Sequence, residues 1–232
     1  MLGVLVNVVA IVIGGTIGLF AHKGLSDRVR IVIMQGIGLS SVVIGIMGSI
    51  MTKNVLLLVI SLALGGIIGS LLKIDYNLDK LGKKIEDKFS EDGGFAKGFV
   101  LSTLIYCVGA MAIVGSMEAG VGGNNTTLYI KSLLDGITAI VFTATLGYGV
   151  IFSSIPVLIY QGGIVLLSKV IAPYMTDALI NEMSAVGGVL IIGIGLTLLE
   201  IKKIHLGDLL PAILIPVLWW IITTLIGIPF IP

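Results

Sequence analysis

Two short stretches of the chain place small and hydroxyl-bearing residues at the same spacing. The stretch "GAMAIVGSMEAGVG" begins at Gly109, and "GITAIVFTATLGYG" begins at Gly136, and both read G-x-x-A-I-V-x-[S/T]-x-x-x-G-x-G. On a helix these small residues form one stripe, along which backbones approach closely and hydroxyls bond across the contact. Hydroxyls, carbonyls freed at glycine-loosened turns and a nearby carboxylate suit a small cation or a small polar solute.

The two stretches therefore predict a site between their helices. We expect the hydroxyls of Ser116, Thr138 and Thr143 to line it at the membrane midplane. Glu118 and Asp135 would act at its outer mouth by attracting or relaying a cation. Glu118 is the strongest acidic candidate because its counterpart in the second stretch is a neutral threonine. The predicted pathway residues are Gly109, Ala112, Ser116, Glu118, Asp135, Thr138, Ala139 and Thr143.

Structural roles compete with this interpretation. Glu118, Lys131 and Asp135 lie near the ends of the predicted helices, where charged side chains reach the membrane surface at little cost. Lys131 and Asp135 are also spaced i, i+4, so they can pair on one helix face. For each acidic residue, structural anchoring and a pathway role both stay open. The other polar residues in or near the apolar segments include Asn7, Gln35, Gln161 and Glu182.

Enzyme chemistry finds no support in the motifs of the chain. The sequence has no H-E-x-x-H, no G-x-S-x-G, no phosphate-binding loop and no cysteine–histidine metal spacing. His22 and His205 fall in loops beside basic residues, which solvated positions explain. We expect no catalytic residue, no metal site and no cofactor.

A net charge of +1, without a basic patch beside aromatic residues, argues against a nucleic-acid partner.

The composition indicates an integral membrane protein. Of the 232 residues, 56% are hydrophobic and 12% are charged, and the mean hydropathy is +1.15. A soluble domain is about a quarter charged. Segments of about 20 apolar residues span a bilayer, and their backbones must be helical. The predicted all-α, polytopic transmembrane bundle has eight spans, or seven if the fifth and sixth merge: 2–21, 31–51, 55–72, 98–117, 133–150, 151–171, 180–199 and 208–228.

Basic residues predict the orientation of these spans. With eight spans, eleven lysines and arginines fall on one side, whereas Lys53, Lys131 and Lys169 fall on the other. Positively charged loops stay in the cytoplasm, so both termini are expected outside. We expect one integral membrane domain over 1–232. Its expected segments are three helices in 1–72, a cytoplasmic amphipathic connecting helix in 73–97, a central repeated pair in 98–150 and three helices in 151–232.

The repeated stretches predict an inverted-topology repeat. The fourth and fifth spans are consecutive, so they cross the membrane in opposite directions and present the same motif from opposite sides. A weaker match supports the repeat, because Asp27, Gly38 and Gly45 align without a gap on Asp177, Gly188 and Gly195. This match pairs spans one to three with spans six to eight. Repeats of this kind commonly hold a substrate or ion site at the midplane.

Two G-x-x-x-G patterns predict close helix packing. Gly14 and Gly18 form the first, and Gly65 and Gly69 form the second. Such glycines let helices approach closely, either within one subunit or between two copies. In a bundle this small, we expect them to support a homodimer.

Several stretches together resemble a known family. These are "GFVLSTLIYCVGAMAIVGSMEAG", "KSLLDGITAIVFTATLGYGV", "YQGG" and "EMSAVGGVLIIGIGL…IKKIHLGDLLPAIL". They are similar to the bacterial membrane-protein family catalogued as domain of unknown function 554, over nearly the whole chain. Ala110 departs from the proline expected there, which bears on how sharply the fourth span is broken. The resemblance implies a multi-pass protein of the bacterial plasma (inner) membrane, and it carries over no catalytic residues.

These observations support two hypotheses of different classes. The first is a small transporter or channel for a small ion or polar solute, with its site between the two repeated helices. The second is a non-transporting membrane scaffold or signalling partner, supported by the packing glycines and the charged connecting helix. The two differ in whether the fourth and fifth spans enclose a water-filled cavity. The sequence does not indicate the substrate, the coupling ion or the direction of transport.

Overall fold

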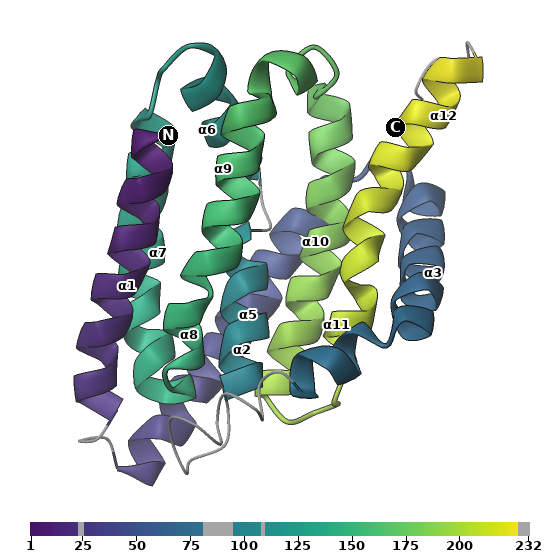
Figure 1. The fold of residues 1–232 in the computed structure, drawn as a ribbon. Coiled ribbons are helices and arrows are strands. Elements are labelled where there is room, and N and C mark those ends of the chain that lie inside the picture. Colours follow the sequence, from purple (N-terminus) through teal and green to yellow (C-terminus); the bar gives the residue numbers. More distant parts are fainter. Residues whose placement is uncertain (23–25, 81–94, 108–109, 227–232) are drawn as a thin grey trace. The chain divides into compact units, whose positions relative to one another are not determined.

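The structure is a computed structural model of the 232-residue chain, and it describes residues 1–22, 26–80, 95–107 and 110–226. Every regular element in these ranges is helical, which confirms the predicted all-α class (Figure 1). Residues 74–80 are helical as well and lie at the start of the predicted connecting helix in 73–97; of the rest, residues 81–94 lie outside the described residues and 95–97 belong to α5. The helices are α1 (Leu2–His22), α2 (Asp27–Ser49), α3 (Val55–Leu72), α5 (Phe95–Cys107), α6 (Ala110–Val121), α7 (Thr126–Leu146), α8 (Gly149–Phe152), α9 (Ser154–Ile171), α10 (Asp177–Leu198), α11 (Leu206–Leu209), the 3-10 helix η1 (Leu210–Leu214) and α12 (Ile215–Ile226).

Seven helical segments in the described ranges are long and apolar enough to cross a membrane, and α5 with α6 forms an eighth candidate bent by 58°. Contacts along α7 indicate that this bent pair makes one complete crossing. A methyl group built on Gly98 of α5 would lie 3.1 Å from the carbonyl oxygen of Leu146, at the end of α7. One built on Gly115 of α6 would lie 3.0 Å from Thr127, at its start. The pair thus runs antiparallel to α7 along its length, as one broken span does.

The packing of α1 on α7 supports the same count of eight spans among the residues that the structure describes. Gly3 donates its backbone N–H to Asn125 Oδ1 at 2.9 Å, just before α7, and Gly18 lies against Ile140 near the end of α7. The two helices are therefore parallel, side by side in Figure 1. Parallel spans must be separated by an odd number of crossings. If α2, α3 and the α5–α6 pair each cross once, three crossings separate α1 from α7, which satisfies this condition. If α5–α6 were a re-entrant loop, only two crossings would separate them, and α1 and α7 would be antiparallel.

Contacts divide the chain into two compact units. The first comprises Met1–Gly36 and Leu78–Tyr174, and the second comprises Ile37–Asn77 and Met175–Pro232. This grouping differs from the division by sequence order, because α1 and the start of α2 group with the central helices, while the rest of α2 and α3 group with the last ones. Each unit therefore joins an early part of the chain to a late part.

In the second unit, α2 and α10 cross at reciprocal glycine contacts. A methyl on Gly45 would lie 2.6 Å from the Gly188 carbonyl oxygen, and one on Gly195 would lie 2.7 Å from that of Gly38. The sequence alignment matched Gly38 with Gly188 and Gly45 with Gly195. Reciprocal contacts between matched positions are what a local twofold relation between two antiparallel helices produces. The complete inverted repeat stays a prediction.

The two G-x-x-x-G patterns lie against helices of the same chain. Methyl groups on Gly14 and Gly18 would overlap the backbone of α7, and those on Gly65 and Gly69 would overlap Ala212 and Asp208. These glycines permit close helix contact within one chain. A homodimer stays a prediction, and it requires a surface other than these covered stripes.

The glycine crossing of α2 and α10 leads to a stability prediction. In Gly45→Ala, the new methyl would meet Gly188 and also Ile192 at 2.6 Å, so the helices must separate. We expect the free energy of unfolding to fall by about 1–3 kcal/mol. Gly36→Ala on the same helix is the matched control, since its methyl would meet no described atom within 4 Å. Thermal unfolding in detergent, followed by circular dichroism, compares the variants, and equal midpoints would contradict the tight crossing.

Candidate functional site

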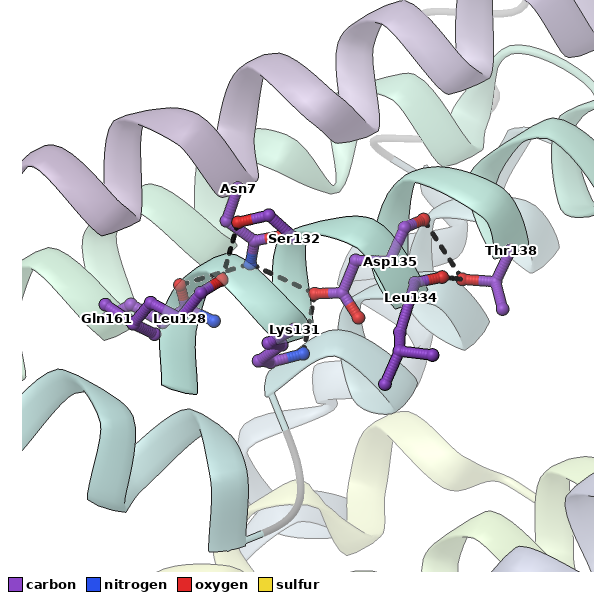
Figure 2. Close-up of polar contacts among 8 residues, drawn as sticks. All are labelled: Asn7, Leu128, Lys131, Ser132, Leu134, Asp135, Thr138 and Gln161. Carbon is purple, nitrogen blue, oxygen red and sulfur yellow. Dashed lines mark hydrogen bonds and ion pairs between the residues drawn. The ribbon is translucent and has the colours of Figure 1, made fainter. Parts of the chain in front are cut away.

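Four polar side chains from three helices meet inside the first unit (Figure 2). Asn7 of α1 donates through Nδ2 to Asp135 Oδ2 of α7 at 3.0 Å and to Gln161 Oε1 of α9 at 3.2 Å. Lys131 Nζ donates to the same Asp135 Oδ2 at 2.6 Å. We call Asn7, Lys131, Asp135 and Gln161 the central polar cluster. All four are buried, and the exposed fractions of Lys131 and Asp135 are 6% and 5%.

The depth of the cluster corrects a sequence expectation. The fifth span was expected to begin at residue 133, with Asp135 at the outer mouth of a pathway, but α7 begins at Thr126. Asp135 is the tenth of its 21 residues, about 14 Å from the start at 1.5 Å per residue. The predicted i, i+4 pairing with Lys131 is confirmed, and both side chains are buried inside the unit instead of lying exposed at a helix end. Lys131 and Ser132 lower the local hydropathy, which hid the first turns of the span.

The ion pair holds two opposite charges within an apolar segment. Moving a charge into a low-dielectric environment costs several kcal/mol, and the opposite charge and hydrogen bonds must offset this cost. Asn7 adds a neutral donor to the carboxylate, while the ring of Tyr106 on α5 lies 6.0 Å from Lys131 Nζ. The cluster as a whole is electrically neutral. Removing one partner would leave the other charge without compensation.

Two polar atoms of the cluster have no hydrogen-bond partner among the described residues. They are Asn7 Oδ1 and Gln161 Nε2. Asn7 and Gln161 are both fully buried. Buried polar atoms without a partner are rare and costly, and they commonly mark a site that binds water, an ion or a ligand. The cluster therefore retains hydrogen-bonding capacity that the chain itself does not use.

An apolar layer lies about one helical turn from the cluster. It contains Val4, Ala119, Leu128 and Val165, which pack together and are buried. Val4 precedes Asn7 by three residues, and Leu128 precedes Lys131 by three. This layer lies between the cluster and the α6–α7 connection. Side chains of this kind restrict the access of water to a polar site within a membrane.

The predicted hydroxyl site between α6 and α7 is not assembled in the structure. Ser116 and Thr143 are both fully buried, with hydroxyls that have no partner among the described residues. Ser116 lies beside the start of α7, next to Gly115, which faces Thr127. Thr143 lies roughly 24 Å further along α7, against Gly15 and Gly18 of α1. Two positions matched by an inverted repeat lie at equal distances on opposite sides of the membrane midplane. They are at the same depth only if both lie at the midplane itself, and these two hydroxyls do not.

The other predicted pathway residues have mainly packing roles. Ala112 and Ala139 are buried, and Ala139 lies against Gly14 of α1. The hydroxyl of Thr138 donates to the carbonyl oxygens of Leu134 and Asp135 on its own helix, at 2.9 and 3.0 Å. Its proton is therefore not available to a ligand in this conformation. Gly109 lies outside the described residues.

Two further acidic residues stabilise connections between helices. Glu118 is half-buried, and its Oε2 accepts from Thr127 Oγ1 at 2.7 Å, which ties the end of α6 to the start of α7. Glu182 of α10 accepts from Thr52 Oγ1 at 2.6 Å and from the Lys53 backbone N–H at 2.8 Å. Within the described residues, no group of three or more histidine, cysteine, aspartate or glutamate side chains could hold a metal ion.

Comparison with known proteins assigns the family. A model of the family described as protein of unknown function (DUF554) matches residues 2–221. The chain belongs to the DUF554 family. It is 36% identical over 220 residues to the "Uncharacterized membrane protein YdfK" of Bacillus subtilis (strain 168), covering 93% of this chain and 94% of that one. It is 29% identical over 221 residues to the "Uncharacterized protein YqgA" of Escherichia coli (strain K12), with the same two shares. No solved structure matches.

Family membership confirms the resemblance read from the motifs, and it supports a membrane protein. It does not identify the central polar cluster of this DUF554 chain, which sequence analysis missed as a group. Asn7 and Gln161 were visible as amides inside apolar segments, and Lys131 as a partner of Asp135. Their convergence could not be found from spacing, since Asn7 and Gln161 are 154 residues apart. Isolated polar residues within long apolar helices are the signal that could have pointed to them.

Proposed function

We propose that this DUF554 protein is a small transporter or channel for an ion or a small polar solute, with the central polar cluster as its site. The observation that carries the proposal is the buried Lys131–Asp135 pair, held with two amides from other helices inside an apolar unit. Ionisable residues within membrane spans are rare, and they commonly mark substrate or ion pathways. The proposal moves the site from the repeated hydroxyls to the interface of α1, α7 and α9.

The proposed location is the bacterial inner membrane, with both termini outside. An even number of crossings puts the two termini on the same side. The excess of basic residues in the loops after the first, third and seventh spans then favours a cytoplasmic position for those loops. Reaction of cysteines introduced near Met1, with a reagent that does not cross membranes, would test the side.

A flux assay with matched charge-removing variants tests the proposed site. Purified protein in liposomes would be screened against inorganic ions and small polar solutes. For any species that crosses, we expect Asp135→Asn to reduce the rate at least about tenfold, as removal of a charge at the site would. Glu118→Gln makes the same chemical change at the α6–α7 connection, and we expect it to retain most of the flux. The thermal midpoint of each variant controls for folding.

The opposite order of effects would restore the sequence prediction, in which Glu118 is the most sensitive acidic residue. Flux that Asp135→Asn leaves unchanged would remove the central polar cluster from the pathway. The second candidate function, a scaffold or signalling partner, is favoured by the use of Glu118 and Glu182 in holding connections. It would take the lead if no species crossed and cross-linking in native membranes captured one specific partner protein.

A further inference from the structure

We propose that Lys131 is a built-in substitute for a monovalent inorganic cation, which binds Asp135 when the lysine ammonium withdraws. This inference rests on the proposed function, and it names the class of substrate or coupling ion. The observations behind it are the Lys131–Asp135 ion pair, the different lengths of its two side chains and the unpartnered oxygen of Asn7.

The two charged groups of the pair differ in how far they can move. Asp135 has a short side chain, and Asn7 of another helix holds its Oδ2 at 3.0 Å. Lys131 has a long flexible side chain and lies five residues after Thr126, where α7 begins. Lysine carries its ammonium on a flexible four-carbon stem, so the ammonium has a wider range of positions than the short carboxylate. The ammonium can therefore move away from Asp135, whereas the carboxylate stays in place.

A fixed carboxylate suits a cation, and two amide oxygens belong to the same cluster. Asn7 Oδ1 is fully buried and has no partner among the described residues, and it belongs to the amide group that contacts Asp135. Gln161 Oε1 lies in the same cluster, 3.2 Å from Asn7 Nδ2. Hard cations prefer carboxylate and amide oxygens as ligands. A small anion would instead have to displace the fixed carboxylate, which the geometry disfavours.

The charge balance selects a monovalent ion. Asp135 supplies one negative charge, which one positive charge neutralises, and Lys131 supplies that charge in the present structure. Exchange of the ammonium for one monovalent cation keeps the buried cluster neutral. A divalent ion would leave a net positive charge in an apolar environment, at high energetic cost. The exchange forms and breaks ionic contacts, and no covalent bond changes.

Cation binding to purified protein in detergent tests the proposal without any transport measurement. Thermal midpoints would be recorded during titration with lithium, sodium or potassium chloride, with choline chloride holding the ionic strength constant. In Lys131→Met the competing ammonium is gone. We therefore expect at least one alkali ion to stabilise this variant with a half-saturating concentration at least about tenfold lower than for the wild type. Lys169→Met, at an exposed position of α9, is the matched control and should respond like the wild type.

Two further variants locate the response and guard against misfolding. Asp135→Asn, alone or combined with Lys131→Met, should abolish the specific response to alkali ions. Adding Asn7→Leu to Lys131→Met should raise the half-saturating concentration, because it removes a proposed oxygen ligand. If Lys131→Met can be purified only in the presence of an alkali ion, and the neutral double variant needs none, the proposal is supported.

The proposal is overturned if Lys131→Met has the same midpoint in every alkali chloride and in choline chloride. It is also overturned if this variant responds to lower pH and to no salt, since a proton would then suffice for Asp135. Its failure is distinguishable from failure of the proposed function. Alkali-ion binding without flux of any species would support the cation site and contradict the transporter function. Flux of a solute, with no stabilisation of Lys131→Met by alkali ions, would support the transporter function and contradict the cation site.

Discussion

Replacing Lys131 by Met is expected to lower the free energy of unfolding by about 3–5 kcal/mol in a choline buffer without alkali ions. The methionine side chain has a similar volume, so the change mainly removes the positive charge beside Asp135. Asp135 is 5% exposed and Asn7 holds its Oδ2, so the carboxylate would remain largely removed from water. Unfolding would be measured by titrating dodecyl sulfate into detergent micelles and following helix content by circular dichroism.

The partner substitution supplies the control for this result. Asp135→Asn should cost clearly less than Lys131→Met, because the freed ammonium lies on a long flexible side chain and can move further than the short aspartate carboxylate. The double variant Lys131→Met/Asp135→Asn removes both charges and should lie within about 1–2 kcal/mol of the wild type, as neutral replacements of buried ion pairs often do. Equal costs for the two single variants would show that the ammonium is fixed as firmly as the carboxylate.

Replacing both Gly14 and Gly18 by Ala is expected to separate α1 from α7. The added methyl groups would overlap the carbonyl oxygens of Gly136 and Ile140, so backbone must move. We expect about 1–3 kcal/mol of destabilisation for each substitution. Because Asn7 lies on α1 and Asp135 on α7, separation of these helices should also weaken the central polar cluster and the flux that depends on it.

The control for this helix contact is Gly163→Ala on α9. A methyl at Gly163 would meet no described atom within 4 Å, so this variant should keep or slightly raise the thermal midpoint. Size-exclusion chromatography with light scattering would be run on the same samples. If the double alanine variant changed the oligomeric state without loss of stability, these glycines would form a contact between copies instead of the α1–α7 contact.

Features that depend on local spacing were accessible from the sequence. The apolar segments are long enough to span a bilayer, and this length alone predicted the all-helical class and seven or eight spans. Lys131 and Asp135 are one turn apart, so their pairing followed from helix geometry. The glycine stripes predicted close helix contacts because a missing side chain lets any neighbouring helix approach closely. Each of these predictions needs the sequence of one helix only, and none needs the identity of its neighbour.

The tertiary structure decided which helices meet and at what depth. Asn7 and Asp135 are 128 residues apart, and no local rule determines that α1 lies parallel to α7. The same packing separated Ser116 from Thr143, tied Glu118 to Thr127 and covered the glycine stripes with helices of the same chain. Hydropathy also hid the first turns of α7, because the hydropathy value of a lysine takes no account of a buried carboxylate that pairs with it. The cost of burying one polar group is offset only when its partner lies beside it, and partners from distant parts of the chain meet only when the chain folds.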